Sequence, residues 1–203
     1  MYIVGLTGSI ASGKSTVSSI LKEEFDAFII DVDGISRNIT AKGTPAYEDI
    51  VNKFRHDILA SDGQIDRKKL GTIVFENPTA RKELEAITHF RIWDETKKLL
   101  KSAKDSAIKI VILDVPLLIE VGWQDRVDEI WLVYLDRATQ MNRLMKRDTL
   151  SLKDSEVRIE SQISLEEKRK YAKVIIDNSQ NLEKTREQVI REYRFLLNNI
   201  NSE

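Results

Sequence analysis

The stretch Gly8-Ser9-Ile10-Ala11-Ser12-Gly13-Lys14-Ser15, followed by Thr16, decides the fold of this chain. It matches the pattern G-x-x-x-x-G-K-S, in which backbone N–H groups of a glycine-rich loop surround phosphate oxygens. The preceding residues, Tyr2–Thr7, predict a short buried strand, and the apolar residues that follow the motif recur at helical spacing. A strand, this loop and a helix are the context that the motif requires, so the sequence predicts a phosphate-binding loop.

The residue types of this motif suit nucleotide binding. Gly8 and Gly13 permit backbone angles that a Cβ would forbid, and the helix N-terminus adds a favourable dipole for an anion. Lys14 is expected to reach the β- and γ-phosphates of a nucleotide, and the Ser15 hydroxyl is expected to bind Mg²⁺. The residues expected to bind ATP along the loop are Ala11, Ser12, Gly13, Lys14, Ser15 and Thr16.

Composition limits the classes of protein that this chain can belong to. It has 203 residues, of which 41% are hydrophobic and 32% charged, and this composition predicts a single globular domain. The formal net charge of −1 argues against a general nucleic-acid binder. There is no cysteine, and charged residues interrupt every apolar run. We therefore expect a cytoplasmic protein that has no signal peptide and does not bind a membrane.

Strands and helices alternate along most of the chain, which predicts an α/β fold with a five-stranded parallel sheet between two layers of helices. Four of the five predicted strands end in an aspartate: Asp31, Asp114, Asp136 and Asp177. Right-handed crossovers place these ends at the edge of the sheet where ligands bind. Aspartate is also a common turn former and helix cap, and this alternative stays open for Asp136 and Asp177.

Two helical segments interrupt this alternation. Residues 34–103 contain only predicted helices and are long for a crossover, so we interpret them as an inserted substrate-binding subdomain. Residues 148–171 are charged and carry two capping-box patterns, which suggests a mobile lid. The core then consists of residues 1–33, 104–147 and 172–203.

The segment Asp31-Val32-Asp33 follows the second predicted strand directly. If the chain stays extended, alternation places both carboxylates on one side, where one can act as a base and the other can hold Mg²⁺ through water. Asp114 ends an apolar strand and is a second candidate for the metal. A structural role for Asp114 in holding the phosphate loop is an equally simple alternative.

Basic residues gather around the predicted lid. Arg143 and Arg147 are four residues apart, so they share a helical face and can together neutralise charge on a transferred phosphoryl group. Such a charged run can equally be a solvated face. His89 and Arg91 lie within the long inserted helix, and two isolated histidines, His89 and His56, do not make a metal site.

The motifs together resemble those of the dephospho-CoA kinase family, nearly from end to end. The resemblance rests on the loop, on Asp31-Val32-Asp33, on Asp62–Arg67, on Asp114-Val115-Pro116-Leu117-Leu118-Ile119-Glu120, on Gln140–Asp148 and on Val174–Ser179. It implies the P-loop NTPase fold and transfer of the ATP γ-phosphoryl group, with Mg²⁺, to the ribose 3′-hydroxyl of dephospho-CoA.

The same resemblance implies roles for several residues. Asp33 corresponds to the base, and Asp31 lies beside it on the acceptor side. His89 and Arg91 fall in the part that binds the CoA moiety, and Asn178 falls near adenine. The sequence departs from the family pattern at Ala11 and Arg55, where glycine is usual, at Phe90, where proline is usual, and at Lys173, where aspartate is usual.

Two alternatives remain. One is a related P-loop kinase that acts on a nucleotide or another small molecule. The other is a P-loop GTPase switch, against which stands the lack of an N-K-x-D motif after a strand. We expect a monomer or a weak homo-oligomer.

Overall fold

A computed structural model of the whole chain describes residues 1–202. Its five strands form one parallel sheet in the order β2-β3-β1-β4-β5. The strands are β1 (Tyr2–Gly8), β2 (Phe28–Asp31), β3 (Ile110–Asp114), β4 (Glu129–Tyr134) and β5 (Val174–Asp177). The α-helices are α1 (Lys14–Phe25), α2 (Val32–Ile39), α3 (Pro45–Phe54), α4 (Arg67–Glu76), α5 (Pro78–Asp105), α6 (Arg137–Asp148), α7 (Leu152–Glu160), α8 (Leu165–Lys168) and α9 (Leu182–Ser202). Short 3₁₀ turns are η1 (His56–Ile58), η2 (Gln124–Arg126) and η3 (Arg169–Tyr171). The predicted α/β fold with a five-stranded parallel sheet is confirmed.

The middle of the sheet carries the phosphate loop. Strand β1 lies between β3 and β4, and its last residue, Gly8, pairs in register with Val133. Leu6 is paired with Asp114, and Asp31 is paired with the same Asp114 from the other side of β3. The parallel direction therefore brings the carboxyl ends of β1, β2 and β3 to one edge, beside the loop.

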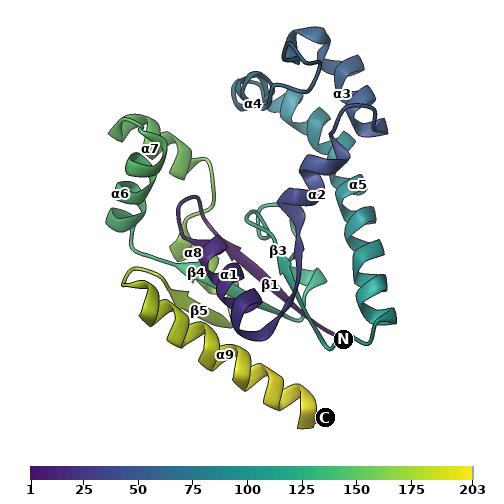
Figure 1. Cartoon of the computed structure of the whole chain (residues 1–203). Coiled ribbons are helices and arrows are strands. Elements are labelled where there is room, and N and C mark those ends of the chain that lie inside the picture. Colours follow the sequence, from purple (N-terminus) through teal and green to yellow (C-terminus); the bar gives the residue numbers. More distant parts are fainter. Residues whose placement is uncertain (203) are drawn as a thin grey trace. The chain divides into compact units, whose positions relative to one another are not determined.

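The sheet is fixed to its helices by an apolar core. Helices α1 and α9 pack against each other and cover the sheet, as can be followed in Figure 1. Val4, Leu21 and Trp131 are wholly buried in this core, and Tyr193 from α9 meets the edge of the Trp131 ring at 6.4 Å between centroids. Burial of such residues is the main favourable term in folding, and it holds the strand that leads into the loop.

The chain divides into two compact units. One comprises residues 1–31 and 103–203, and the other, which we call the helical unit, is Val32–Ser102. The helical unit has a small core of its own around Ile50, Ile58 and Leu70. Thr44 and Asp66 cap α3 and α4 by accepting hydrogen bonds from backbone N–H groups.

Two of the departures from the family pattern have an unusual backbone. Ala11 has φ of 60°, and Arg55 has φ of 65° with ψ of −178°. Glycine adopts both conformations without strain, whereas a residue with a Cβ adopts them at a cost of about 1–3 kcal/mol. The preference for glycine at these two positions therefore has a direct conformational cause.

None of the helices within residues 1–202 combines the length and the apolar character needed to span a bilayer.

Candidate active site

The phosphate loop runs from Gly8 to the start of α1 at Lys14. Gly13 has φ of 87°, and a Cβ at this residue would lie 2.0 Å from the Asn178 side chain. Both the backbone angle and the space therefore require glycine at position 13. Helix α1 begins directly after it, so its first N–H groups and the positive end of its dipole face the loop, where an anion is favoured.

Side chains from three other elements bind the carbonyl groups of the loop. Lys168 donates to the carbonyl of Gly8 at 3.0 Å, Gln140 donates to that of Ile10 at 2.9 Å, and Asn178 donates to that of Ser12 at 2.8 Å. These are alternate residues of the loop. A carbonyl that accepts from outside leaves neighbouring N–H groups free to turn inward, which is the arrangement of a phosphate nest.

Asn178 lies beneath the loop rather than at an open surface. It is 6% exposed, its Nδ2 donates to Ser12 and its Oδ1 accepts from the Thr185 hydroxyl at 2.8 Å. Both ends of the amide are thus engaged within the protein, and the residue fixes the loop backbone.

Lys14 forms an ion pair with Asp114 at the end of β3. The second carboxylate oxygen of Asp114 accepts a hydrogen bond from the Ser18 hydroxyl at 2.6 Å. Asp114 is 6% exposed, so its charge is compensated by these two groups from α1. The sequence did not single out Ser18, although its spacing of four residues from Lys14 puts both on one face of α1.

The aspartates after β2 are arranged differently from the prediction. Asp31 is the last residue of β2, but Val32 already begins α2, so Asp33 lies in the first turn of a helix. The expected extended alternation of the two carboxylates is therefore wrong. Both side chains are exposed, and Asp31 is the register partner of Asp114.

The other two aspartates that the sequence placed at strand ends are structural, and Asp136 lies two residues beyond the end of β4. Asp136 caps α6, accepting from the Thr139 N–H at 2.9 Å and from its hydroxyl at 2.6 Å. These hydrogen bonds, that from the Thr139 hydroxyl first, lower the pKa of Asp136 below its usual value. Asp177 accepts from the Ser179 N–H at 2.8 Å. The turn-and-cap interpretation thus holds for both residues.

Helix α6 brings arginines beside the loop. Met141 and Leu144 pack in a cluster that Ile10 and Ala11 also contact, and Gln140 binds the loop directly. Arg143 follows Gln140 by three residues, on the same side of α6. Within residues 1–202 it has neither an ion-pair nor a hydrogen-bond partner.

Arg147, one turn after Arg143, is engaged by acidic neighbours. Its guanidinium binds Asp148 through two hydrogen bonds, of 2.7 and 3.1 Å, which raises the pKa of Arg147. Asp148 also accepts from Arg158 of α7 at 3.3 Å, so its pKa is lowered, chiefly by Arg147.

The predicted lid, residues 148–171, contains α7 and α8, each capped by the serine that the sequence indicated. Ser151 accepts from the Asp154 N–H and Ser164 from the Glu167 N–H, both at 3.1 Å. One charged residue of this segment, Lys168, is buried rather than solvated. The Lys168 side chain has no exposed surface, and its ammonium group binds Glu120 at 2.9 Å.

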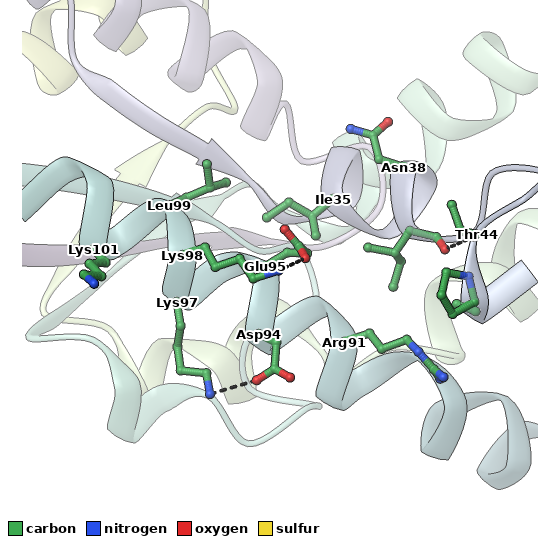
Figure 2. Close-up of a pocket in the computed structure, with 13 residues that line it drawn as sticks. Ile35, Asn38, Thr44, Arg91, Asp94, Glu95, Lys97, Lys98, Leu99 and Lys101 are labelled. Atoms are coloured by element: carbon green, nitrogen blue, oxygen red, sulfur yellow. Dashed lines mark hydrogen bonds and ion pairs between the residues drawn. The ribbon is translucent and has the colours of Figure 1, made fainter.

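The helical unit contains a groove of about 870 Å³ between α2 and α5. Figure 2 shows Ile35 and Asn38 of α2 on one side of it and the side chains of α5 along the other. Its basic residues are Arg91, Lys97, Lys98 and Lys101. Lys97 and Lys98 are paired with Asp94 and Glu95, whereas Lys101 has no ion-pair partner in the described part of the chain.

The two substrate-binding candidates of α5 are not brought together. Arg91 lines the groove, where it binds Asp49 at 2.5 Å and the Ile87 carbonyl at 2.6 Å. His89 is half-buried and does not line the groove.

The oxygen atoms beside the loop suit an Mg²⁺ ion that is bound together with a nucleotide. In residues 1–202, no group of three or more His, Cys, Asp or Glu side chains is placed to hold a metal ion. Mg²⁺ in nucleotide sites needs only one or two protein oxygens, because phosphates and water complete its coordination. The exposed hydroxyl of Ser15 and the carboxylate of Asp114, which is engaged here by Lys14 and Ser18, are oxygens of this kind.

A glycine-rich loop at the end of a central parallel strand, a lysine at the start of the next helix and a strand-end aspartate beside it define a P-loop nucleotide-binding protein. Comparison with known proteins identifies the family. The family model described as dephospho-CoA kinase matches residues 2–184, and the chain belongs to this family.

Similar proteins agree with this assignment. The dephospho-CoA kinase of Carboxydothermus hydrogenoformans is 48% identical over 93% of this chain and 91% of its own length. That of Geobacter sulfurreducens is 49% identical over 88% of this chain and 90% of its own length. The solved dephospho-CoA kinase of Campylobacter jejuni is 31% identical, covers 96% of both chains and superposes with a TM-score of 0.71.

The structure allows the two roles left open for Asp114 to be separated. We expect Asp114→Asn to lower turnover by at least about a hundredfold, because the neutral amide no longer orients the Lys14 ammonium or supports a cation. The fold should persist, since Asn matches Asp in size and still accepts from Ser18. Steady-state kinetics and a thermal melt of the variant test this.

Asp136→Asn is the matched control, because this aspartate also lies just beyond a β-strand, two residues after β4, but serves as a helix cap. It should keep near-normal turnover and lose stability of about 1 kcal/mol at most. Near-normal turnover in Asp114→Asn would leave Asp114 with a structural role only.

Proposed function

We propose that this protein transfers the γ-phosphoryl group of ATP to the ribose 3′-hydroxyl of dephospho-CoA, giving coenzyme A and ADP, the last step of coenzyme A biosynthesis. The observation that carries the proposal is the match to the dephospho-CoA kinase family across residues 2–184, with Lys14 and Asp114 paired beside the loop. The absence of cysteine from the sequence supports a cytoplasmic location.

The phosphates of ATP bind at the loop in this proposal. The residues from Ala11 to Thr16 surround them, and Lys14 exchanges its partner Asp114 for the β- and γ-phosphate oxygens. Asn178 contributes by holding the Ser12 carbonyl, not by touching adenine, because both ends of its amide are already engaged.

Asp33 is the base of the proposed reaction. It accepts the proton of the 3′-hydroxyl as the ribose oxygen forms a bond to the γ-phosphorus, while the bond from that phosphorus to the bridging oxygen breaks and ADP leaves. Its position in the first turn of α2 leaves the carboxylate exposed, as a base that meets a bound substrate must be. Asp31, which precedes it, lies beside Asp114 in the sheet and is proposed to contact the acceptor side.

Ser15 and Asp114 would hold Mg²⁺, with Asp114 acting directly or through water. When bound, Mg²⁺ neutralises phosphate charge and orients the β- and γ-phosphates. Arg143 and Arg147 are proposed to contact the phosphates as well. Of the two arginines, Arg143 is the stronger candidate for a phosphate contact. It is unpaired within the described residues and lies three residues after Gln140, which binds the loop.

The acceptor is proposed to use the groove of the helical unit. Dephospho-CoA carries a long, weakly polar arm and a diphosphate, and the groove combines apolar residues such as Ile35 and Leu99 with basic residues. Its volume lies within the range of small-molecule sites. Arg91 supports this assignment as a lining residue, whereas His89 would act from outside the groove.

A coupled assay of ADP release tests the proposed reaction. With ATP and Mg²⁺ present, dephospho-CoA should produce ADP in stoichiometric amounts with coenzyme A, and GTP should not replace ATP. If ADP release does not depend on dephospho-CoA, the proposal fails, and a panel of other hydroxyl acceptors then separates this enzyme from related small-molecule kinases.

Replacement of the base should affect chemistry more than binding. We expect Asp33→Asn to lower turnover by at least about a hundredfold with nearly unchanged ATP affinity, because the amide cannot take the proton. Asp57→Asn, an exposed aspartate of the same unit, should behave like the unaltered enzyme. Turnover of Asp33→Asn close to normal would remove this residue from the mechanism.

Two lysines of α5 test the groove as the acceptor site. Lys101 lines the groove and Lys82 does not, and both are exposed. Lys101→Glu should raise the KM for dephospho-CoA by roughly tenfold through repulsion of the diphosphate, with the KM for ATP unchanged. Lys82→Glu should alter neither constant, and an equal effect of both variants would place the acceptor elsewhere.

A further inference from the structure

Lys168 is a charged residue in a position where an apolar residue would be expected. It ends the short helix α8, and its side chain has no exposed surface. Burial lowers the pKa of the Lys168 ammonium, and the neighbouring Glu120 carboxylate opposes this shift. A buried ion pair contributes little net stability compared with apolar side chains of the same size. Stability therefore does not account for a lysine at this position, and the contacts of its ammonium group are the better guide to its role.

Those contacts join the two sides of the phosphate site. The Lys168 ammonium donates to the Gly8 carbonyl and to the Pro116 carbonyl, each at 3.0 Å, in addition to Glu120. Gly8 begins the phosphate loop, and Pro116 follows Asp114, the partner of Lys14, by two residues. The Thr7 hydroxyl donates to the same Pro116 carbonyl at 3.0 Å. The ammonium group thus sets the spacing between the start of the loop and the segment after β3.

A second contact fastens the same part of the chain to the loop. The Oε1 atom of Gln162, between α7 and α8, accepts from the Ser9 hydroxyl at 2.7 Å and from the Ile10 N–H at 2.8 Å. The next residue, Ile163, donates its N–H to Glu120 at 3.2 Å. The segment from Gln162 to Lys168 therefore holds the loop at Gly8, Ser9 and Ile10.

We propose that Lys168 is a positioning residue for ATP: its ammonium group, together with Glu120, holds the carbonyls of Gly8 and Pro116 so that the loop is shaped for phosphate before the nucleotide arrives. Because the segment 162–168 and the loop bind each other, ATP and this segment stabilise one another reciprocally. The inference rests on the proposed use of ATP and adds no step to the chemistry.

The test removes both charges at once, because Lys168→Met alone would leave the partly buried Glu120 without a counter-ion. In the full-length protein, Lys168→Met combined with Glu120→Gln should raise the Kd for ATP, measured by calorimetry, at least tenfold. The KM for dephospho-CoA at saturating ATP should change less than twofold. Lys170→Met is the matched control, because Lys170 lies two residues after Lys168, in η3, but is largely exposed and its ammonium group binds Glu167 at the surface.

A merely structural role predicts a different result. In that case the double variant would melt at a lower temperature but, well below that temperature, bind ATP within twofold of the unaltered protein, and this outcome overturns the inference. If the unaltered protein itself binds no ATP, the proposed function falls as well. If the double variant still binds ATP normally, only the inference about Lys168 is refuted, and the proposed function stands.

A second measurement does not depend on folding of a variant. Hydrogen–deuterium exchange of the unaltered protein should show that ATP slows exchange of the backbone amides in residues 161–168. Residues 190–200 of α9, remote in sequence from the loop contacts, serve as the internal reference. Exchange in residues 161–168 that does not respond to saturating ATP contradicts the proposed coupling.

Discussion

The phosphate loop can point backbone N–H groups toward a phosphate only if its carbonyl groups point away and find hydrogen-bond donors elsewhere. The site depends on the side chains that supply these donors. Within the loop, the carbonyls of Ser9 and Gly13 accept hydrogen bonds from backbone N–H groups, whereas other loop carbonyls are bound by side chains. Here three side-chain nitrogens bind the carbonyls of Gly8, Ile10 and Ser12. They come from α8, α6 and the segment after β5, so elements distant in sequence determine the shape of a short, local motif.

The parallel sheet also positions the ion pair between Lys14 and Asp114. Parallel pairing of β1 with β3 brings Asp114 to the edge where the loop begins, and Lys14 reaches it from the first turn of α1. The carboxylate is held on its other side by Ser18. A lysine that an aspartate already holds beside the loop needs little rearrangement when the nucleotide binds, which is the benefit of preorganisation in phosphoryl transfer.

Much of this could be predicted from the sequence, because the signals are local. The phosphate loop, the strand ends and the helix caps at Thr44, Ser151 and Ser164 each depend on a few neighbouring residues. The position of Asp33 was missed, because a helix that starts directly after a strand has no distinctive pattern. Lys168 was missed for another reason: its partners Gly8 and Pro116 lie 160 and 52 residues away, and a charged run normally indicates a solvated face.

The alanine at position 11 has a consequence for the loop before a nucleotide binds. Its backbone is left-handed, and its methyl group packs with the cluster formed by Met141, Leu144 and Ile159. A glycine at this position would visit many more conformations in the empty loop and would lose that freedom on binding phosphate. With Ala11, part of this conformational entropy is already lost when the protein folds. The empty loop is therefore more restricted and loses less conformational entropy when it binds its ligand.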